Sequence, residues 1–236
     1  MNRYQDEDWQ QEEQRRREAY YRMNSQNSNT PDALEQIFRG PLNWMNLLMI
    51  GINVVIFIIM EFLGSTEDTG FMLQWGAACR PFILNGEWYR LFTSMFLHFG
   101  AEHLLNNMFM LAVLGNELET KIGKRHFAGI YLVSGLCASI ASVVYHYYIA
   151  DYAVSAGASG AIYGIFGAFI VFMIMNRDDG RKFSIGRIAF VVFLLIFGSF
   201  QETVDFVAHI GGFIAGAVLA IILCINKRKT EVLRQW

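Results

Sequence analysis

Two residues of this chain, Ser159 and His209, have the types needed for covalent chemistry. Ser159 stands in the run Gly157-Ala158-Ser159-Gly160, where an apolar stretch punctuated by glycines begins, and His209 lies in another apolar stretch fifty residues further on. A serine hydroxyl becomes an effective nucleophile when a neighbouring base accepts its proton, and neutral imidazole suits that task near pH 7. The pair therefore predicts a Ser-His dyad that works inside a membrane.

Small residues near both side chains predict how they could meet. Gly160 and Gly164 are four residues apart, as are Gly212 and Gly216. Glycines at this spacing let two membrane helices approach closely. If these helices pack against each other, the serine and the histidine come within hydrogen-bonding reach. The alternative is that Ser159 is an ordinary packing residue, although an ionisable side chain within a membrane usually marks function.

A second polar cluster could stabilise the negative charge that develops during acyl transfer. His103 and Asn107 are four residues apart and project from one face of a helix. Donors so placed could hold an oxyanion, at roughly 3–4 kcal/mol per donor. The alternative is hydrogen bonding between helices. Asn106, three residues after His103, is not excluded by spacing alone.

The composition indicates the solvent around these residues. The chain has 236 residues, of which 54% are hydrophobic and 17% charged, too apolar for an ordinary soluble domain. Uncharged or nearly uncharged stretches of near-spanning length predict an all-α membrane protein with six transmembrane helices, since a backbone in lipid must satisfy its own hydrogen bonds. The alternating ten-residue strands of a membrane barrel are not seen. The stretches cover about residues 45–63, 104–115 with flanks, 127–148, 158–175, 188–200 and 206–225.

The distribution of basic residues predicts orientation. Seventeen of the 19 Lys and Arg residues lie before residue 44, in the loops 117–126 and 176–187, or after residue 225. By the positive-inside rule both termini are cytoplasmic and Ser159 lies toward the outer face. We expect the membrane to be a bacterial plasma membrane, and no secretory signal peptide is recognised because the first apolar stretch begins only near residue 45.

Three regions follow from the composition. Residues 1–40 are polar and rich in Gln, Glu, Arg and Asn, which predicts a short polar helix and a flexible linker, or alternatively an arm that binds a membrane surface or partner. Residues 41–226 form the predicted membrane domain, and residues 227–236 a short basic tail. Cys79, Cys137 and Cys224 have no metal-like spacing, so we expect packing residues and neither a metal nor another cofactor.

These motifs together resemble the rhomboid family of intramembrane serine proteases, from about residue 42 to residue 226. Four motifs occur in the family's order. They are Trp88-Tyr89-Arg90 with the stretch leading to His98, His103-x-x-x-Asn107, Gly157-Ala158-Ser159-Gly160 and Ala208-His209-Ile210-Gly211-Gly212. One residue separates Trp88 from Arg90 here, which departs from the family pattern.

The resemblance implies a role for each matching position. Ser159 would be the nucleophile, His209 the general base, and His103, Asn107 and the Ser159 backbone N–H the oxyanion hole. Supporting roles fall on Tyr163 (stacking on the imidazole), Gly157, Gly160, Gly212 (close helix approach), Glu119 (structural hydrogen bonding), Trp88 and Arg90. The resemblance also implies transmembrane protein substrates that enter laterally from the lipid bilayer, past a gate formed by the fifth helix and the loop 201–205. No nucleic acid is expected as a partner, and the oligomeric state is open.

The sequence favours this interpretation over several others. Asp205 precedes His209 by four residues and could complete a triad, although an aspartate at a helix start is more often a cap. A metal hydrolase is disfavoured because no HExxH or carboxylate-rich cluster lies in the apolar stretches. A catalytically inactive rhomboid-like scaffold that binds membrane helices is the main non-enzymatic alternative. A small-solute transporter would need polar residues along a path through the bilayer.

Overall fold

The computed structural model describes residues 12, 15–18, 43–175 and 205–233. The chain divides into two compact units, Met1–Pro41 and Leu42–Trp236. Within the first unit, the described residues are helical, and Arg16 forms an ion pair with Glu12 at 2.9 Å. The second unit contains every motif singled out from the sequence.

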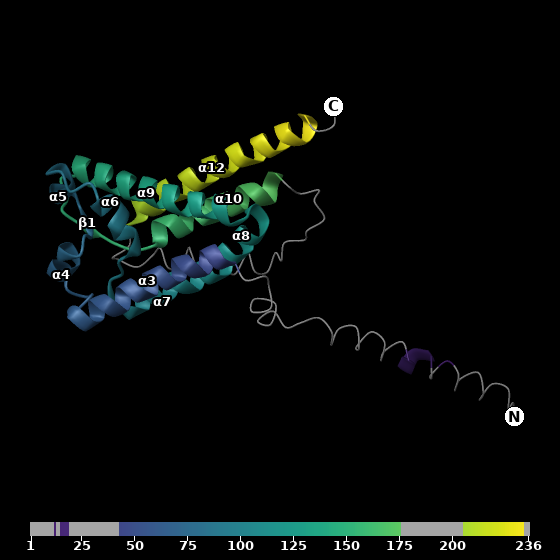
Figure 1. Cartoon of the computed structure of the whole chain (residues 1–236), viewed down its shortest axis with the longest axis horizontal. Helices are drawn as coiled ribbons and strands as arrows, with labels where there is room; N and C mark the ends of the chain where they lie inside the picture. Colours follow the sequence, from purple (N-terminus) through teal and green to yellow (C-terminus); the bar gives the residue numbers. More distant parts are fainter. Residues whose placement is uncertain (1–11, 13–14, 19–42, 176–204, 234–236) are drawn as a thin grey trace, which may run out of the picture. The chain divides into compact units, whose positions relative to one another are not determined.

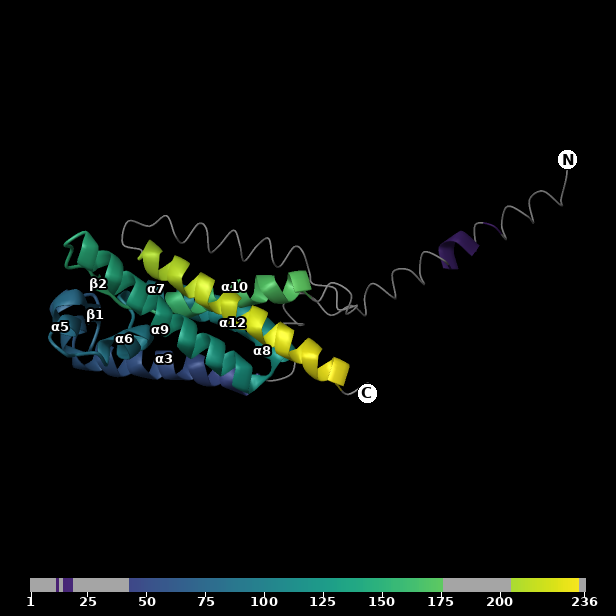
Figure 2. The same ribbon diagram turned by 90° about the horizontal axis from the view of Figure 1, so that it is seen from above.

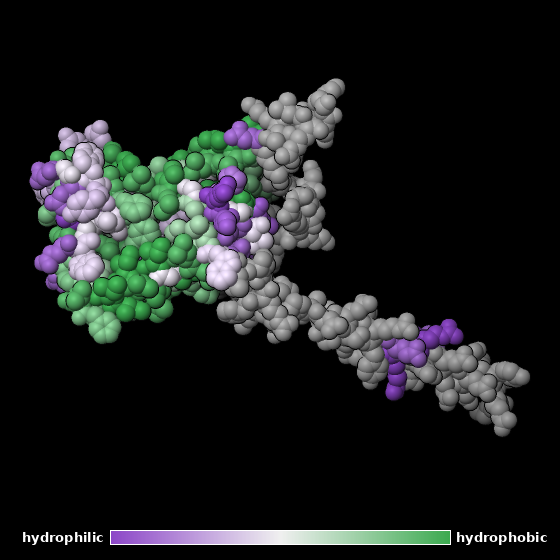
Figure 3. Space-filling view, in the orientation of Figure 1, coloured by the Kyte–Doolittle hydropathy of each residue, from purple (hydrophilic) through white to green (hydrophobic). Residues whose placement is uncertain are grey.

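Helices dominate the second unit (Figure 1). In chain order they are α3 (Trp44–Leu63), α4 (Thr69–Gln74), α5 (Arg80–Leu84), α6 (Arg90–Thr93), the 3-10 helix η1 (Ser94–Phe96), α7 (Gly100–Met110), the π-helix η2 (Leu111–Gly115), α8 (Asn116–Ile122), α9 (Lys124–Tyr148), α10 (Ser159–Met175) and α12 (Phe206–Leu233). Among the described residues, three helices are long and apolar enough to cross a membrane: Trp44–Leu63, Lys124–Tyr148 and Phe206–Asn226. A hydrophobic band lies between hydrophilic ends of this unit, as expected for lipid contact (Figure 3).

Helices occupy five of the six stretches predicted from hydropathy within the described part of the chain. The stretch 188–200 and the loop 201–204, predicted as gate and cap, lie outside the described residues, so the count of six remains a prediction. The segment around 104–115 extends further than its apolar core, because α7, η2 and α8 follow one another without a break.

The π-turn at η2 brings α8 against the start of α3. Gly115 lies so close to Asn46 that an added Cβ would be 2.7 Å from the Asn46 side-chain Cγ. One turn later, Glu119 accepts hydrogen bonds from the backbone N–H groups of Met45 at 3.2 Å and Asn46 at 2.7 Å. These are orphan donors of the first turn of α3, so the buried carboxylate caps that helix.

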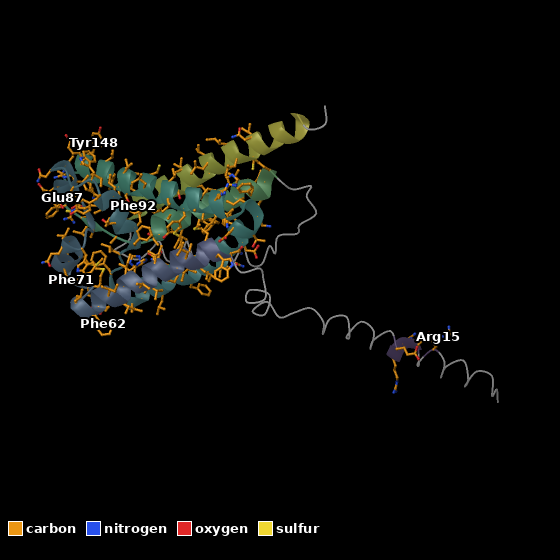
Figure 4. All side chains as sticks on the ribbon, in the orientation of Figure 1. Arg15, Phe62, Phe71, Glu87, Phe92 and Tyr148 are labelled. Atoms are coloured by element: carbon orange, nitrogen blue, oxygen red, sulfur yellow. The ribbon has the colours of Figure 1, made fainter. Side chains whose placement is uncertain are left out.

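A short antiparallel ladder was not predicted from the sequence. Strand β1 (Ala78–Cys79) pairs with β2 (Val154–Ser155), with Cys79 opposite Val154. Two-residue strands carry no hydropathy alternation that could have revealed them. The ladder ties the loop after α4 to the segment that leads into α10. Figure 4 shows Phe71, Glu87 and Tyr148 at the end of the unit where this ladder lies.

The helices α9, α10 and α12 pack together through small residues (Figure 2). A Cβ added to Gly160 would lie 2.5 Å from Ala138 Cβ, and one added to Gly212 would lie 2.9 Å from the Gly160 carbonyl carbon. A Cβ added to Gly216 would lie 2.6 Å from Gly164 Cα. The backbones of α10 and α12 are therefore in direct contact at both predicted glycine pairs.

Candidate active site

Ser159 is the first residue of α10, and the two residues before it are held by hydrogen bonds from elsewhere. The Gly157 N–H donates to the Ser94 carbonyl oxygen at 2.9 Å, and the Ala158 N–H donates to His98 Nε2 at 3.3 Å. Gly157 has φ +141°, a conformation that other residues rarely adopt. The turn that presents Ser159 is thus fixed by its backbone.

Gly157 also keeps open the space between Ser159 and His103. A Cβ added to Gly157 would lie 2.8 Å from His103 Cε1, 3.0 Å from His103 Nε2 and 3.7 Å from Ser159 Oγ. The imidazole and the hydroxyl therefore border the same small volume. Any larger residue at this position would fill that volume and push against the His103 ring.

Of the two neighbouring asparagines, Asn106 and Asn107, it is Asn107 that contacts His103. Its side-chain Nδ2 donates to the His103 carbonyl oxygen at 2.9 Å, and the residue is only 6% exposed. Since an amide nitrogen carries two hydrogens, this bond leaves one for another acceptor. Asn106, which spacing could not exclude, is exposed on a different face of α7.

His209 is the fourth residue of α12 and packs against α10. Its ring stacks on the ring of Tyr163, with centroids 4.0 Å apart and planes 13° from parallel. The residue is 6% exposed, and its Nδ1 atom has no hydrogen-bond partner among the described residues. Tyr163 is one turn after Ser159, so α10 brings the serine and the stacking tyrosine to the same side as His209. A hydrogen bond between Ser159 and His209 remains a prediction.

Both carboxylate oxygens of Asp205 accept hydrogen bonds from groups other than the His209 imidazole. Its Oδ1 accepts from the Ala208 N–H at 3.0 Å, which makes it the N-cap of α12, and its Oδ2 accepts from the Ser142 hydroxyl of α9. The geometry therefore corresponds to the capping interpretation rather than to a triad.

The sequence model described as "Rhomboid domain" matches residues 85–226, well over half of the chain. The chain belongs to the rhomboid family. It is 33% identical over 192 residues to the rhomboid protease GluP of Bacillus subtilis (strain 168), covering 81% of this chain and 37% of GluP. It is 28% identical over 211 residues to the rhomboid protease AarA of Providencia stuartii, covering 80% of this chain and 75% of AarA.

A third relative is the putative rhomboid protease YdcA of Bacillus subtilis (strain 168), 34% identical over 149 residues, or 62% of this chain and 72% of YdcA. The chain thus spans little more than a third of GluP but most of the other two. Membership of the rhomboid family, together with the long apolar helices, identifies an integral membrane protein, and GluP and AarA are both named as rhomboid proteases.

Of the rhomboid motif Trp88-Tyr89-Arg90, the arginine organises the first loop. Arg90 is buried, and its Nη1 donates to the carbonyl oxygens of Leu73 at 2.6 Å and Ala77 at 3.0 Å. Its Nε donates to Glu87 at 2.7 Å. Bonding to Tyr89 and then to Arg90 lowers the pKa of the Glu87 carboxyl. Trp88 has no such role in the described contacts and is 63% exposed, as suits a residue at the membrane surface.

Three contributors near the site had no role assigned from the sequence. His98 is fully buried, and its ring lies 5.2 Å edge-on from that of His103. Ser142 bonds Asp205, and Thr66 accepts from the Gly100 N–H at 3.2 Å. A histidine just before a helix was a visible signal for His98, whereas the other two look like ordinary small polar residues. No cluster suited to a metal ion occurs within the described residues.

Proposed function

We propose that this chain is a rhomboid-type serine endopeptidase that cleaves transmembrane protein substrates within the bilayer through a dyad of Ser159 and His209. One observation carries the proposal: His209 stacks on Tyr163, one turn after Ser159, where α10 and α12 meet at Gly160 and Gly212. An imidazole held flat against the ring one turn after the nucleophile is restrained in its tilt.

The catalytic cycle follows from the groups around Gly157. A substrate carbonyl enters the space bordered by Ser159 and His103, and the Ser159 hydroxyl attacks its carbon while His209 accepts the hydroxyl proton. His103, the second Asn107 N–H hydrogen and the Ser159 backbone N–H donate to the oxygen as it becomes negative. The peptide C–N bond breaks as His209 returns the proton to the leaving amine.

Water completes the cycle. A water molecule gives its proton to His209 and attacks the ester, and the proton returns to Ser159 as the acid product leaves. His103, Ser159 and His209 lie within the first four residues of α7, α10 and α12, so the proposal requires water to enter from the end of the unit where these helices begin. By the positive-inside rule this end faces outward and both termini face the cytoplasm.

The decisive experiment is labelling of the detergent-solubilised full chain with a fluorophosphonate, comparing the native protein with Ser159→Ala and His209→Ala. The proposal predicts labelling of the native protein and at least about a 1,000-fold lower labelling rate in both variants, the scale on which triads fail when one member is removed. A transmembrane substrate in proteoliposomes should be cleaved only by the native chain. A folded native protein that neither labels nor cleaves would favour the inactive scaffold.

A further inference from the structure

Asp205 joins the helix that carries His209 to a helix that carries no dyad residue. One carboxylate oxygen caps α12 through the Ala208 N–H at 3.0 Å, and the other accepts from the Ser142 hydroxyl on α9. Ser142 is 1% exposed, so its partner approaches it within the packed interior. Ser142 and Asp205 are 63 residues apart in the sequence, and the hydrogen bonds to both carboxylate oxygens are directional.

The turn of α9 just before Ser142 is in contact with both dyad helices. Ala138 lies against Gly160 of α10 and Gly212 of α12, where added Cβ atoms would be 2.5 and 3.4 Å from Ala138 Cβ. A Cβ added to Gly211 would lie 2.7 Å from Ala141 Cβ. This part of α9 therefore contacts both the helix that carries Ser159 and the helix that carries His209.

Small residues let these helices approach closely, but they do little to prevent one helix from sliding along the other. Glycine and alanine faces have no long side chains that interlock, so close approach alone does not fix the position of α12 along its axis. The stack of His209 on Tyr163 also tolerates sideways displacement of two nearly parallel rings. A hydrogen bond at the start of α12, by contrast, has a narrow range of length and angle.

We propose that Asp205, bonded to Ser142, is a positioning residue that sets the axial position of α12 and thereby aligns His209 with Ser159. The inference rests on the proposed function. His209 is four residues after Asp205, and its backbone N–H donates to the Asp205 carbonyl oxygen at 3.2 Å, so displacement at the cap moves the imidazole directly. Because both carboxylate oxygens are engaged elsewhere, Asp205 acts through position and not as a third catalytic group.

Turnover of a transmembrane substrate in proteoliposomes tests this role. Ser142→Ala and Asp205→Ala should each lower kcat about 10- to 100-fold with KM changed less than threefold, because a displacement of about 1 Å at a reacting group can cost 100-fold. The double variant should be no less active than the less active single variant, because both substitutions remove the bond between Ser142 and Asp205. Ser134→Ala is the matched control: Ser134 is also buried on α9, but its hydroxyl donates within its own helix to the Ile130 carbonyl oxygen at 2.5 Å.

The Asp205→Asn variant distinguishes a positioning role for Asp205 from a role as the third member of a catalytic triad. Asparagine keeps an acceptor for the Ala208 N–H and can donate to the Ser142 oxygen, so kcat should stay within about fivefold of native. A loss as large as that of Asp205→Ala would overturn the inference, and a loss approaching about 10,000-fold, the cost of the equivalent change in a known triad, would favour a triad instead.

Fluorophosphonate labelling separates the two proposals. If the native chain does not label at Ser159, the proposed function fails. If the native chain labels and both Ser142→Ala and Asp205→Ala label and turn over within threefold of native, only the positioning role is overturned. Thermal unfolding in detergent identifies any variant that loses activity by losing its fold, and Ser142→Ala, which leaves the cap intact, keeps the test valid if Asp205→Ala does not fold.

Discussion

Replacing Gly216 with alanine tests whether catalysis depends on the closeness of α10 and α12. A Cβ at this position would lie 2.6 Å from Gly164 Cα, whereas ordinary contact begins at 3.4 Å. The opposing atoms belong to the backbone, so no change of rotamer can relieve the overlap. The helices must therefore separate or shift by at least about 0.8 Å, the difference between those two distances, because the Gly164 carbonyl oxygen and carbon are nearer still.

This displacement should be felt at the dyad although Gly216 is seven residues beyond His209. A shift approaching 1 Å predicts a loss of up to about 100-fold in kcat, or about 2.7 kcal/mol in the activation barrier. Overpacking should also lower the free energy of unfolding by roughly 1–3 kcal/mol. Turnover of a reconstituted transmembrane substrate and the rate of fluorophosphonate labelling measure the first effect, and thermal unfolding in detergent measures the second.

Gly129→Ala provides the matched control for Gly216→Ala. Gly129 is also within a long helix, α9, but an added Cβ meets nothing within 4 Å. This substitution should leave activity unchanged and stabilise the helix by up to about 1 kcal/mol. If Gly216→Ala kept kcat and labelling within threefold of native, the argument that catalysis requires the close approach of α10 and α12 would be refuted.

Three further predictions concern the contacts around the site. Glu119→Gln should lower the free energy of unfolding by about 1–3 kcal/mol in detergent, because an amide offers one acceptor oxygen where the carboxylate serves two N–H groups. Thr66→Val should lower kcat up to about fivefold, and Thr66→Ser should not, because only a hydroxyl can accept from the Gly100 N–H that begins α7, at a net worth of about 1 kcal/mol. The bond from Tyr89, and then that from Arg90, lowers the pKa of Glu87 from its usual 4.5, so these bonds contribute fully at neutral pH and are lost as the pH falls below 4.5 and through the lowered pKa. Melting temperatures from pH 7 to pH 3 should therefore fall more steeply for the native chain than for Glu87→Gln, and identical slopes would contradict this.

Hydropathy predicted the long helices well because lipid imposes a strong rule on the backbone. The stretch predicted over about residues 45–63 corresponds to α3 (Trp44–Leu63), and that over 158–175 to α10 (Ser159–Met175). Helix ends that lie in water are not set by hydropathy. Helix α9 therefore begins before its apolar stretch, and α12 continues to Leu233, beyond the end of its apolar stretch. The glycine spacing predicted the contact of α10 with α12, since the four-residue period places small residues on one face.

Much of the support around the site could not be predicted, because it depends on pairs that are far apart in sequence. Ser142 and Asp205 are separated by 63 residues, and neither has a neighbour whose spacing suggests the other. Thr66 and Gly100 are 34 residues apart. Such contacts need the folded arrangement of three or more elements, and a single hydroxyl gives no periodic signal. The motifs indicate which residues could react, but not what holds them in place.

The same device recurs on the three helices that carry the proposed dyad and oxyanion-hole residues: the beginning of each helix is tied by a side chain from elsewhere. Ser142 holds the cap of α12, His98 holds the Ala158 N–H ahead of α10, and Thr66 holds the Gly100 N–H of α7. His103 and His209 are each the fourth residue of their helices, and Ser159 is the first of its own. Lipid provides little hydrophobic force to align one helix with another, so directional bonds near helix starts can supply the precision that small-residue packing lacks. Since each tie acts on a different helix, lesions in two of them should combine additively in the activation barrier, whereas lesions at the two ends of one tie should not.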